Sequence, residues 1–387
     1  MSKIKKIIVW LLTVVTVCSA FVLPSSAESV AVASPSVSAQ SAVLIEAESG
    51  EVVYEKSCDT RLPMASTTKI MTALVALELA APETVIRVDA AAVGVEGSSI
   101  YLVAGEELTL EQLLYALLLE SANDAAAAIA IGVSGSIEAF ADRMNQKAAE
   151  LGLTDTHFTN PHGLDHEEHY TTARELAYIA RAAMQNELFC TIASTRKATI
   201  PHAGVDGVRL LINHNKLLRL YDGCIGVKTG YTKRSGRCLV SAAERDGVTL
   251  IAVTLNAPSD WNDHTAMLDY GFTRYRSVTL CNANELLYPL SLVNGTDAYV
   301  MLGNKEALTV TLPAGAGKIE RTVEYRRFEY APIASGDVCG KVVFRCDTDG
   351  DGLRETVGEV DLVAQYSVER LEVKQSFWDW LLSLFSF

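Results

Sequence analysis

The sequence has no cluster of lysine and arginine large enough to follow a nucleic-acid backbone. Its 33 basic residues are outnumbered by 47 acidic ones, and the formal net charge is −14. Binding along DNA or RNA needs a concentrated positive surface. We therefore expect no nucleic-acid partner. Hydrophobic residues make up 49% of the chain, which is enough to bury a substantial core.

The sequence also lacks a cysteine pattern typical of a disulfide framework or of a zinc site. Eight cysteines are present, and Cys18 lies in a segment that we expect to be removed. The remaining seven thiols cannot all pair within the chain, because their number is odd. Cys224 and Cys238 are candidates to face each other across adjacent strands. Scattered buried thiols are the more ordinary interpretation.

Two groups of potential metal ligands lack a complete metal-binding motif. The first comprises His162, His166 and His169, and it lacks the H-E-x-x-H spacing. The second comprises Asp347, Asp349 and Asp351, which resemble the start of a calcium loop. Gly358 stands where the closing glutamate of such a loop belongs. We therefore expect the histidine group to lie in a loop before a helix and the aspartate group to lie in an acidic hairpin turn. We expect neither group to be a metal site.

The N-terminus has the layout of a secretory signal peptide. Three lysines within the first six residues precede an apolar run over residues 7–23. Ser25 and Ala27 follow at the positions of a small-residue cleavage site. We expect residues 1–27 to be removed on export. Cleavage after Ala20 and an uncleaved membrane helix are the alternatives.

The rest of the chain divides into a linker, two domains and a short amphipathic end. Residues 28–41 are rich in Ser, Ala and Val and are expected to be a linker. Residues 42–275 combine capped amphipathic helices with short strands, which predicts an α+β domain with helices on both sides of an antiparallel sheet. Residues 276–373 show alternating strand patterns between turn residues and predict a small all-β domain.

Several elements of the first domain have approximate expected limits. The expected helices cover residues 66–79, 109–120, 124–131, 136–151, 172–184 and 264–270. The expected strands cover residues 42–45, 52–54, 225–229, 238–243 and 250–255.

The last residues, 374–387, are predicted to form an amphipathic helix at a membrane surface. Four polar residues fall on one narrow stripe at helical spacing, and two Trp and three Phe lie among the others. The segment is too short to span a bilayer, but it suits a helix lying in the interface. A terminal helix packed on the β domain or on a partner chain is the alternative. With export, this predicts peripheral attachment to the outer face of the cytoplasmic membrane.

Three short motifs occur in order, and the first pairs a nucleophile with a base. In Ser66-Thr67-Thr68-Lys69, the spacing places Ser66 and Lys69 one helical turn apart on one face. A serine hydroxyl becomes a good nucleophile when a base takes its proton. A lysine can be that base if it is neutral, which burial and a second nearby cation favour.

The second and third motifs supply a proton relay and binding groups. Ser121-Ala122-Asn123 lies where one expected helix ends and the next begins, so a hydroxyl and an amide are available there. Lys228-Thr229-Gly230 lies on an expected strand and offers a cation, a hydroxyl and a glycine that admits a close backbone. Lys228 is also the candidate second cation beside Lys69. Together the motifs form the S-x-x-K, S-x-N and K-T-G set of serine penicillin-recognising enzymes.

The residues around these motifs resemble the low-molecular-weight D-alanyl-D-alanine carboxypeptidases, a family of penicillin-binding proteins. The stretches that carry the resemblance are LLLESANDAA at 117–126, HFTNPHGLD at 157–165, HYTTA at 169–173 and DGCIGVKTGYT at 222–232. Ala122 stands where glycine is common. The resemblance covers residues 42–275 closely, and the β domain and amphipathic end more loosely. It implies a serine β-lactamase/DD-peptidase-like catalytic domain.

The resemblance also implies roles for the motif residues and identifies partners. Ser66 attacks the carbonyl of the penultimate D-alanine and forms an acyl-enzyme, while Lys69 accepts its proton. Three residues assist: Ser121 and Lys228 pass a proton to the departing amine, and Asn123 holds the acyl-side amide.

On the leaving-group side, Thr229 and Lys228 meet the terminal carboxylate. At the attacked carbonyl, the N–H groups of Ser66 and Tyr231 form the oxyanion hole. Gly230 completes the binding strand. The implied partners are peptidoglycan stem peptides and, as covalent inhibitors, β-lactam antibiotics. No metal or organic cofactor is implied.

Other activities share these residues. A DD-endopeptidase that cuts cross-links uses the same set. A β-lactamase needs an additional base, for which Glu167, Glu168 and Glu175 lie in the right interval, but that interval matches the carboxypeptidases. A non-catalytic wall-binding or morphogenesis protein on the same fold is a different class of function, and the intact Ser66 and Lys69 count against it.

Overall fold

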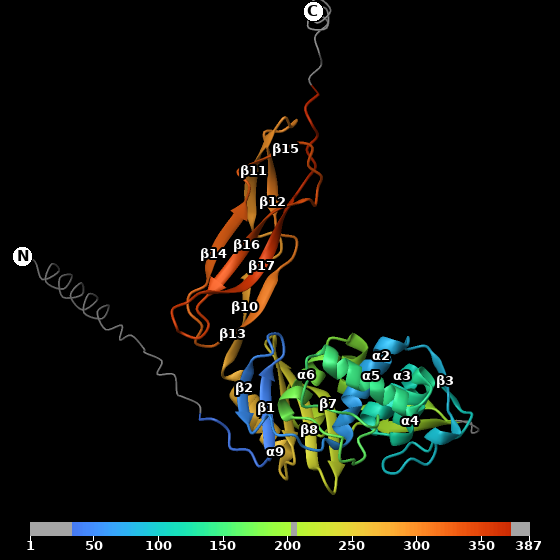
Figure 1. Ribbon diagram of the computed structural model, residues 1–387. Coiled ribbons are helices and arrows are strands. Elements are labelled where there is room, and N and C mark those ends of the chain that lie inside the picture. Colours follow the sequence, from blue (N-terminus) through green and yellow to red (C-terminus); the bar gives the residue numbers. More distant parts are fainter. Residues whose placement is uncertain (1–32, 203–206, 373–387) are drawn as a thin grey trace, which may run out of the picture. The chain divides into compact units, whose positions relative to one another are not determined.

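The computed structural model describes residues 33–202 and 207–372, and its first part is built on a five-stranded sheet (Figure 1). All neighbouring strands of this sheet are antiparallel. Their order across the sheet is β2 (Val52–Lys56), β1 (Ser41–Glu46), β9 (Val248–Leu255), β8 (Gly236–Arg245) and β7 (Cys224–Thr232). The strand that carries the K-T-G motif, β7, is therefore an edge strand.

Both faces of this sheet are buried. Along β1, Val43 and Ile45 belong to one hydrophobic core, while Ala42 and Leu44 belong to a second core on the other face. Successive side chains of a strand point to opposite faces, so each face of β1 is apolar. This pattern explains why the strand reads as a continuous apolar run, and it requires a layer of helices on each side.

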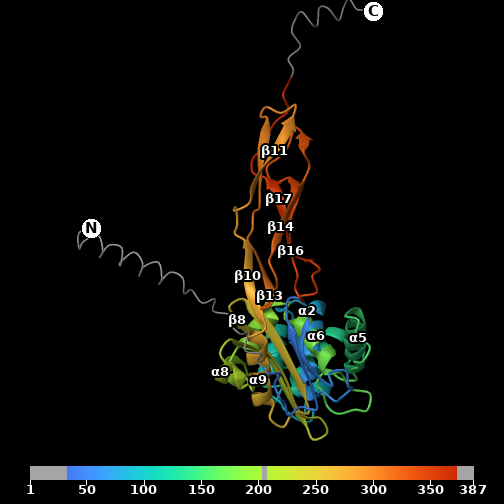
Figure 2. The same ribbon diagram turned by 90° about the vertical axis from the view of Figure 1, so that its left-hand side faces the viewer.

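Helices supply both layers (Figure 2). The larger layer packs on one face, and α9 (Asp260–Phe272) contributes Met267 and Leu268 to the core on the other. The larger layer contains α2 (Lys69–Leu79), α3 (Leu110–Leu119), α4 (Asn123–Ser134), α5 (Ile137–Glu150), α6 (Ala173–Ala183) and α7 (Glu187–Ser194). The predicted antiparallel sheet with helices on both sides is confirmed.

Three of the six expected helix starts are confirmed by their capping residues, whereas the helix expected from residue 264 begins earlier, at Asp260. Thr109 forms a reciprocal capping box with Gln112 at the start of α3. Ser136 caps α5, and Thr172 caps α6. The first expected helix differs, because it begins with a 3-10 turn, η1 (Ala65–Thr68), and α2 starts only at Lys69. Ser66 therefore lies on a tighter turn than we expected.

Several short elements were not expected. They are β3 (Val85–Arg87), η2 (Ala90–Ala92), β4 (Glu107–Thr109), β5 (Lys197–Pro201), β6 (Val208–Ile212) and α8 (Leu217–Leu220). β3 pairs with β4, and β5 pairs with β6. Three to five residues are too few for a periodic pattern to identify a strand.

The second part of the chain is all β. β10 (Tyr275–Cys281) pairs with β13 (Leu308–Pro313). A six-stranded sheet has the order β14 (Glu320–Tyr325), β16 (Val338–Cys346), β17 (Glu355–Ala364), β12 (Tyr299–Gly303), β11 (Leu287–Val293) and β15 (Phe328–Tyr330). Its core contains Leu290, Val300, Val342 and Leu362. The expected all-β character is confirmed.

The suggestion that Cys224 and Cys238 face each other is wrong. Both lie on paired strands, but Cys224 is opposite Ala243 and Cys238 is opposite Gly230. Every cysteine among the described residues is a free thiol. Four of them are buried, so the interpretation as ordinary buried thiols holds for these.

The expected signal peptide and the expected C-terminal helix lie outside the described residues. Within residues 33–202 and 207–372, no single helix is long and apolar enough to cross a membrane. Together, α4 and α5 are long and apolar enough for a membrane span, but an 84° bend separates the two helices.

Candidate active site

Ser66 and Lys69 lie together at the start of α2. The Lys69 Nζ atom is 3.0 Å from the Ser66 Oγ atom. It also donates to the Asn123 side-chain oxygen at 2.6 Å and to the His162 backbone oxygen at 2.7 Å. The Asn123 and His162 oxygens fix the amine beside the hydroxyl. A neutral amine held by these two acceptors directs its lone pair at the Ser66 hydroxyl, as proton abstraction from a serine requires.

The surroundings of Lys69 favour its neutral form. Its side chain is completely buried. Burial is the main cause that lowers the pKa of Lys69 well below its ordinary value, and the charge of Lys228 lowers it further. Asp124 acts in the opposite direction and does not cancel the effect. A buried amine of this kind can accept a proton near neutral pH.

The strand β7 brings the third motif against the first. Lys228 is also buried, its Nζ atom donates to the Thr229 backbone oxygen at 2.9 Å, and burial lowers its pKa to about 7. A Cβ atom on Gly230 would lie 3.0 Å from the Ser66 backbone nitrogen. Glycine at this position therefore lets β7 approach η1 closely, with Tyr231 next along the edge strand.

The S-x-N motif forms the opposite wall. Ser121 has a positive φ of 58° and ends the α3 region, and Asn123 begins α4. Besides accepting from Lys69, the Asn123 amide donates to the Glu96 backbone oxygen, and its backbone N–H donates to Ser98. Asn123 thus joins the base to the loop that contains Ser98.

A buried ion pair holds the other end of this loop, away from Asn123. Arg209, on β6, is buried with Glu106 in an ion pair of 2.5 Å. Its guanidinium also donates to the backbone oxygens of Ile100 and Tyr101. Buried charges are retained where they are paired and hydrogen-bonded, so this pair fixes the loop beside Ser121.

These residues line one cleft of about 370 Å³. Its lining combines five of the expected residues with six that the sequence reasoning did not select. The expected ones are Ser66, Ser121, Thr229, Gly230 and Tyr231. The additional ones are Ser98, His214, Lys216, Arg237, Asp260 and Trp261. Lys69, Asn123 and Lys228 lie behind this surface, since all three are buried.

Arg237 is the most informative of the additional residues. It lies on β8 directly opposite Tyr231. Its guanidinium is 2.8 Å from the buried carboxylate of Asp260 and lies over the Trp261 ring at 5.5 Å. These two contacts hold a planar cation in the cleft, where a carboxylate can bind it. The pairing of β7 with β8 as a hairpin was the sequence signal that could have placed Arg237 opposite Tyr231.

A glycine and a histidine support the strained turn before Ser66. Ala65 has a positive φ of 47°, and the space beside its carbonyl is filled by Gly163. The Nδ1 atom of His169 accepts from the Thr159 backbone, so its Nε2 atom carries the proton toward the Thr68 hydroxyl at 2.8 Å. Thr68 in turn donates to the Ala65 oxygen. This chain of bonds orients the nucleophile turn.

The histidine group divides into buried and exposed side chains. His162 and His169 are buried, and burial lowers the pKa of each to about 3, whereas His166 is exposed. The loop before α6 that we expected for this segment is confirmed.

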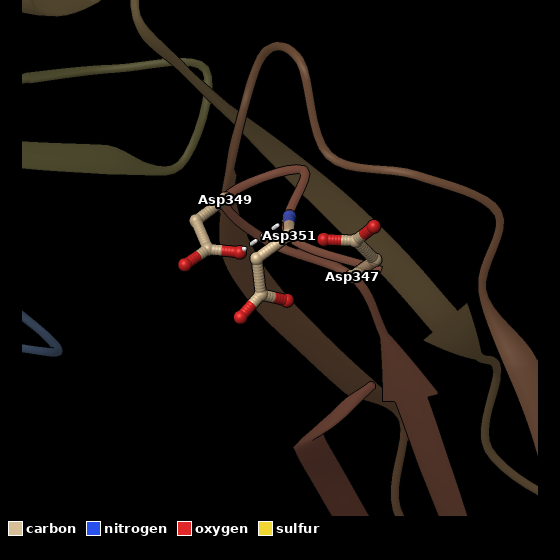
Figure 3. Close-up of side chains that lie close together, drawn as sticks. All are labelled: Asp347, Asp349 and Asp351. Atoms are coloured by element: carbon tan, nitrogen blue, oxygen red, sulfur yellow. Dashed lines mark hydrogen bonds between the residues drawn. The ribbon is translucent and has the colours of Figure 1, made fainter. Parts of the chain in front are cut away.

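The acidic run lies in the turn between β16 and β17, as expected (Figure 3). Carboxylate oxygens of Asp347, Asp349 and Asp351 come within 4.8 Å of one another. They also accept backbone N–H groups of the same turn, as in the bonds from Gly350 to Asp347 and from Leu353 to Asp351. These bonds stabilise the hairpin turn.

A helix-and-sheet domain that brings S-x-x-K, S-x-N and K-T-G side chains together defines a serine penicillin-recognising enzyme. Comparison with known proteins gives the family. Residues 28–259 match the model of the D-alanyl-D-alanine carboxypeptidase family, and residues 275–370 match that of the C-terminal domain of penicillin-binding protein 5. The chain belongs to the D-alanyl-D-alanine carboxypeptidase family.

Individual relatives extend over both parts of the chain. The chain is 34% identical to D-alanyl-D-alanine carboxypeptidase DacF of Bacillus subtilis, over 82% of this chain and 84% of the relative. It is 29% identical to DacC of Escherichia coli, over 92% and 90%. Penicillin-binding protein 5 of Haemophilus influenzae has a similar structure, with a TM-score of 0.64, 27% identity and coverage of 88% and 100%. The expected fold is confirmed.

Proposed function

We propose that the chain is a serine-type D-alanyl-D-alanine carboxypeptidase that removes the terminal D-alanine from peptidoglycan stem peptides. One observation carries this proposal. A lysine amine whose pKa is lowered well below its ordinary value by burial and by a second cation lies 3.0 Å from the hydroxyl of Ser66. This pair supports nucleophilic catalysis without a metal ion or an organic cofactor.

In the acylation step, Lys69 takes the proton of the Ser66 hydroxyl as its oxygen attacks the carbonyl of the penultimate D-alanine. The backbone N–H groups of Ser66 and Tyr231 stabilise the oxyanion. The C–N bond then breaks, Ser121 and Lys228 pass a proton to the departing amine, and free D-alanine leaves. The rest of the peptide remains as an ester on Ser66.

The two walls of the cleft bind the two sides of the scissile bond. Thr229 and the guanidinium of Arg237 face the terminal carboxylate, and the Lys228 cation attracts it from behind Thr229. An arginine suits this group because its fork binds both oxygens. Asn123 orients Lys69 in the free enzyme. Its side-chain N–H, which bonds the Glu96 oxygen, is available to the acyl-side amide when the peptide displaces that contact.

Deacylation reverses the roles of the groups. Lys69 takes a proton from water, whose oxygen attacks the ester carbonyl, and the Ser66 oxygen recovers a proton as it leaves. Penicillin acylates the same serine, but its ring-opened product retains the leaving group and hydrolyses slowly. β-Lactams are therefore covalent inhibitors in this proposal.

The place of action follows from the ends of the sequence. We propose that residues 1–27 direct export and are removed, and that residues 374–387 hold the protein at the outer face of the cytoplasmic membrane. In this arrangement residues 42–275 form the catalytic domain and residues 276–373 a β domain next to the anchor. A role in cell-wall maturation fits the substrate.

The proposal is tested with the signal-free protein and a peptide that ends in D-alanyl-D-alanine, with the products weighed by mass spectrometry. Loss of one alanine residue, abolished by Ser66→Ala and by penicillin, is the expected result. A cross-linked stem-peptide dimer is assayed beside it. Cleavage of the dimer with an unchanged pentapeptide would instead support the endopeptidase, and covalent penicillin binding without either cleavage would support a binding role.

A further inference from the structure

One face of the β domain is apolar although it is exposed. It is formed by the outward side chains of β11, β12 and β15, and we call it the aromatic face. Its members are Leu287, Pro289, Ser291, Val293, Tyr299, Met301, Phe328 and Tyr330. The alternate residues of the same strands, such as Leu290, Leu292 and Val300, belong to the core.

Strand register places these side chains side by side. Ser291 pairs with Tyr299 on one neighbour and with Phe328 on the other, and Val293 pairs with Tyr330. Residues paired across strands share a face of the sheet. The rings of Phe328 and Tyr330 also meet edge to face, with 5.8 Å between their centroids. The aromatic side chains therefore form one continuous surface.

This surface departs from the usual pattern of a sheet with one solvent-facing side. Such a face normally carries polar residues that alternate with the buried ones. Here Ser291 is the single polar member, and Tyr299, Phe328 and Tyr330 are 53%, 50% and 58% exposed. A contiguous apolar surface of this kind marks a binding site rather than ordinary exposure.

The chain leaves the described part of the structure at the end of the β domain where β11 and β15 lie (Figure 1). Near the end of the described chain, the Leu371 backbone N–H donates to Asn294 at 2.7 Å, directly after β11. Arg370 bridges to Gly295, and Thr296 donates to Glu369. The turn at 294–296 joins β11 to β12, so the exit point lies at the end of the face that carries Val293 and Tyr330.

The sequence beyond this exit identifies the occupant. Residues 373–387 contain two Trp and three Phe among leucines, the composition of a segment that enters a membrane interface. We infer that the aromatic face contacts the interfacial zone of a lipid bilayer next to that segment. Tyrosine and other amphipathic rings prefer this zone, where one part of the ring is apolar and its polar tip remains wet.

Charge near the face is mixed. Arg326 is paired with Glu329 beside Phe328, whereas Arg327 and Arg370 are exposed. Because the chain is acidic overall, we expect apolar contact to supply most of the added affinity and these two arginines a smaller, salt-dependent part. The aromatic face thus acts as a second attachment that limits how the β domain tilts on the membrane.

The test compares vesicle binding of the signal-free full-length chain with that of a variant carrying Tyr299→Ser, Phe328→Ser and Tyr330→Ser. Vesicles of phosphatidylcholine with phosphatidylglycerol are sedimented, and covalent penicillin labelling of each variant reports an intact catalytic domain. The matched control carries Tyr101→Ser and Leu220→Ser, because these side chains are 81% and 71% exposed but lie in the catalytic domain.

We expect the triple variant to bind vesicles about tenfold more weakly, because burial of aromatic rings is lost, and the control to bind like the parent. A second measurement places a probe on the face. In a background with Trp378→Phe and Trp380→Phe, Trp261 of the catalytic domain remains and is measured first as the reference signal. The further change Phe328→Trp should add an indole that brominated lipids quench.

Three results would overturn the inference. The first is equal vesicle binding by the triple variant and the parent. The second is an indole that is shielded from acrylamide without lipid and becomes accessible when residues 374–387 are deleted, which would show that the chain end covers the face. The third is a dimer that the triple variant loses. None of these results depends on peptidase activity, so they leave the proposed enzyme untouched.

Discussion

The close approach of Gly163 to Ala65 makes Gly163 a sensitive position outside the catalytic residues. A Cβ atom added to Gly163 would lie 1.9 Å from the Ala65 backbone oxygen and 2.4 Å from its carbonyl carbon. Real Cβ atoms essentially never come closer than 3.0 Å to such a neighbour. The backbone at Ala65 or at Gly163 must therefore move by about 1 Å to accept the methyl group.

This displacement acts directly on the nucleophile. Ala65 is bonded to Ser66, and its oxygen is the acceptor of the Thr68 hydroxyl. A misplacement of about 1 Å in a catalytic group costs on the order of 100-fold in rate. We therefore expect Gly163→Ala to reduce the second-order rate of acylation by penicillin roughly 100-fold.

The assay is the rate of covalent labelling by a fluorescent penicillin, with the melting temperature measured in parallel. Gly152→Ala is the matched control, because Gly152 also has a positive φ, +73° against +89° for Gly163, but has no atom within 4 Å of the added Cβ. Both variants carry the cost of strained backbone, and only one carries the clash. Equal labelling rates for the two variants would refute the argument.

Three further changes test separate parts of the site. Lys228→Gln removes a positive charge near Lys69 and so raises the pKa of Lys69, which moves the rise of acylation rate with pH to higher pH in a stopped-flow pH series. Arg237→Leu should lower kcat/KM for a peptide with a free terminal carboxylate at least about tenfold more than for its amide. Glu106→Gln leaves Arg209 buried and unpaired, and should reduce the free energy of unfolding by roughly 3 kcal/mol in a thermal or denaturant melt.

Each of these has a distinct contrary result. A pH profile that keeps its midpoint in Lys228→Gln would show that the second cation does not act on the base. Equal losses on acid and amide substrates would show that Arg237 has a structural role alone, and Arg237→Lys should restore part of the preference for the acid. An unchanged melting temperature in Glu106→Gln would show that the ion pair contributes no net stability.

The part of the site that local spacing controls was predictable from the sequence. Ser66 and Lys69 are three residues apart, and either a 3-10 or an α-helical turn brings them to one side. The capping residues Thr109 and Thr172 similarly identified helix starts. Such features depend on neighbours along the chain, which a sequence displays directly.

The part that depends on register and tertiary contact was not predictable in the same way. Arg237 reaches the cleft because β8 pairs with β7 at one register, and Asp260 and Trp261 come from the start of α9. The same register separates Cys224 from Cys238, contrary to what their positions around the motif indicated. One residue of slip in a strand pair changes every such contact.

Ser66 is the acylated nucleophile in the proposed mechanism, and one measurement tests this role most directly. The signal-free protein is mixed with a peptide ending in D-alanyl-D-alanine, quenched in acid within one turnover and digested, and the ester is located by mass spectrometry. We predict an adduct that lacks one alanine on the fragment containing Ser66, and its absence in Ser66→Ala. An adduct on another residue, or cleavage by folded protein that persists in Ser66→Ala, would contradict the account.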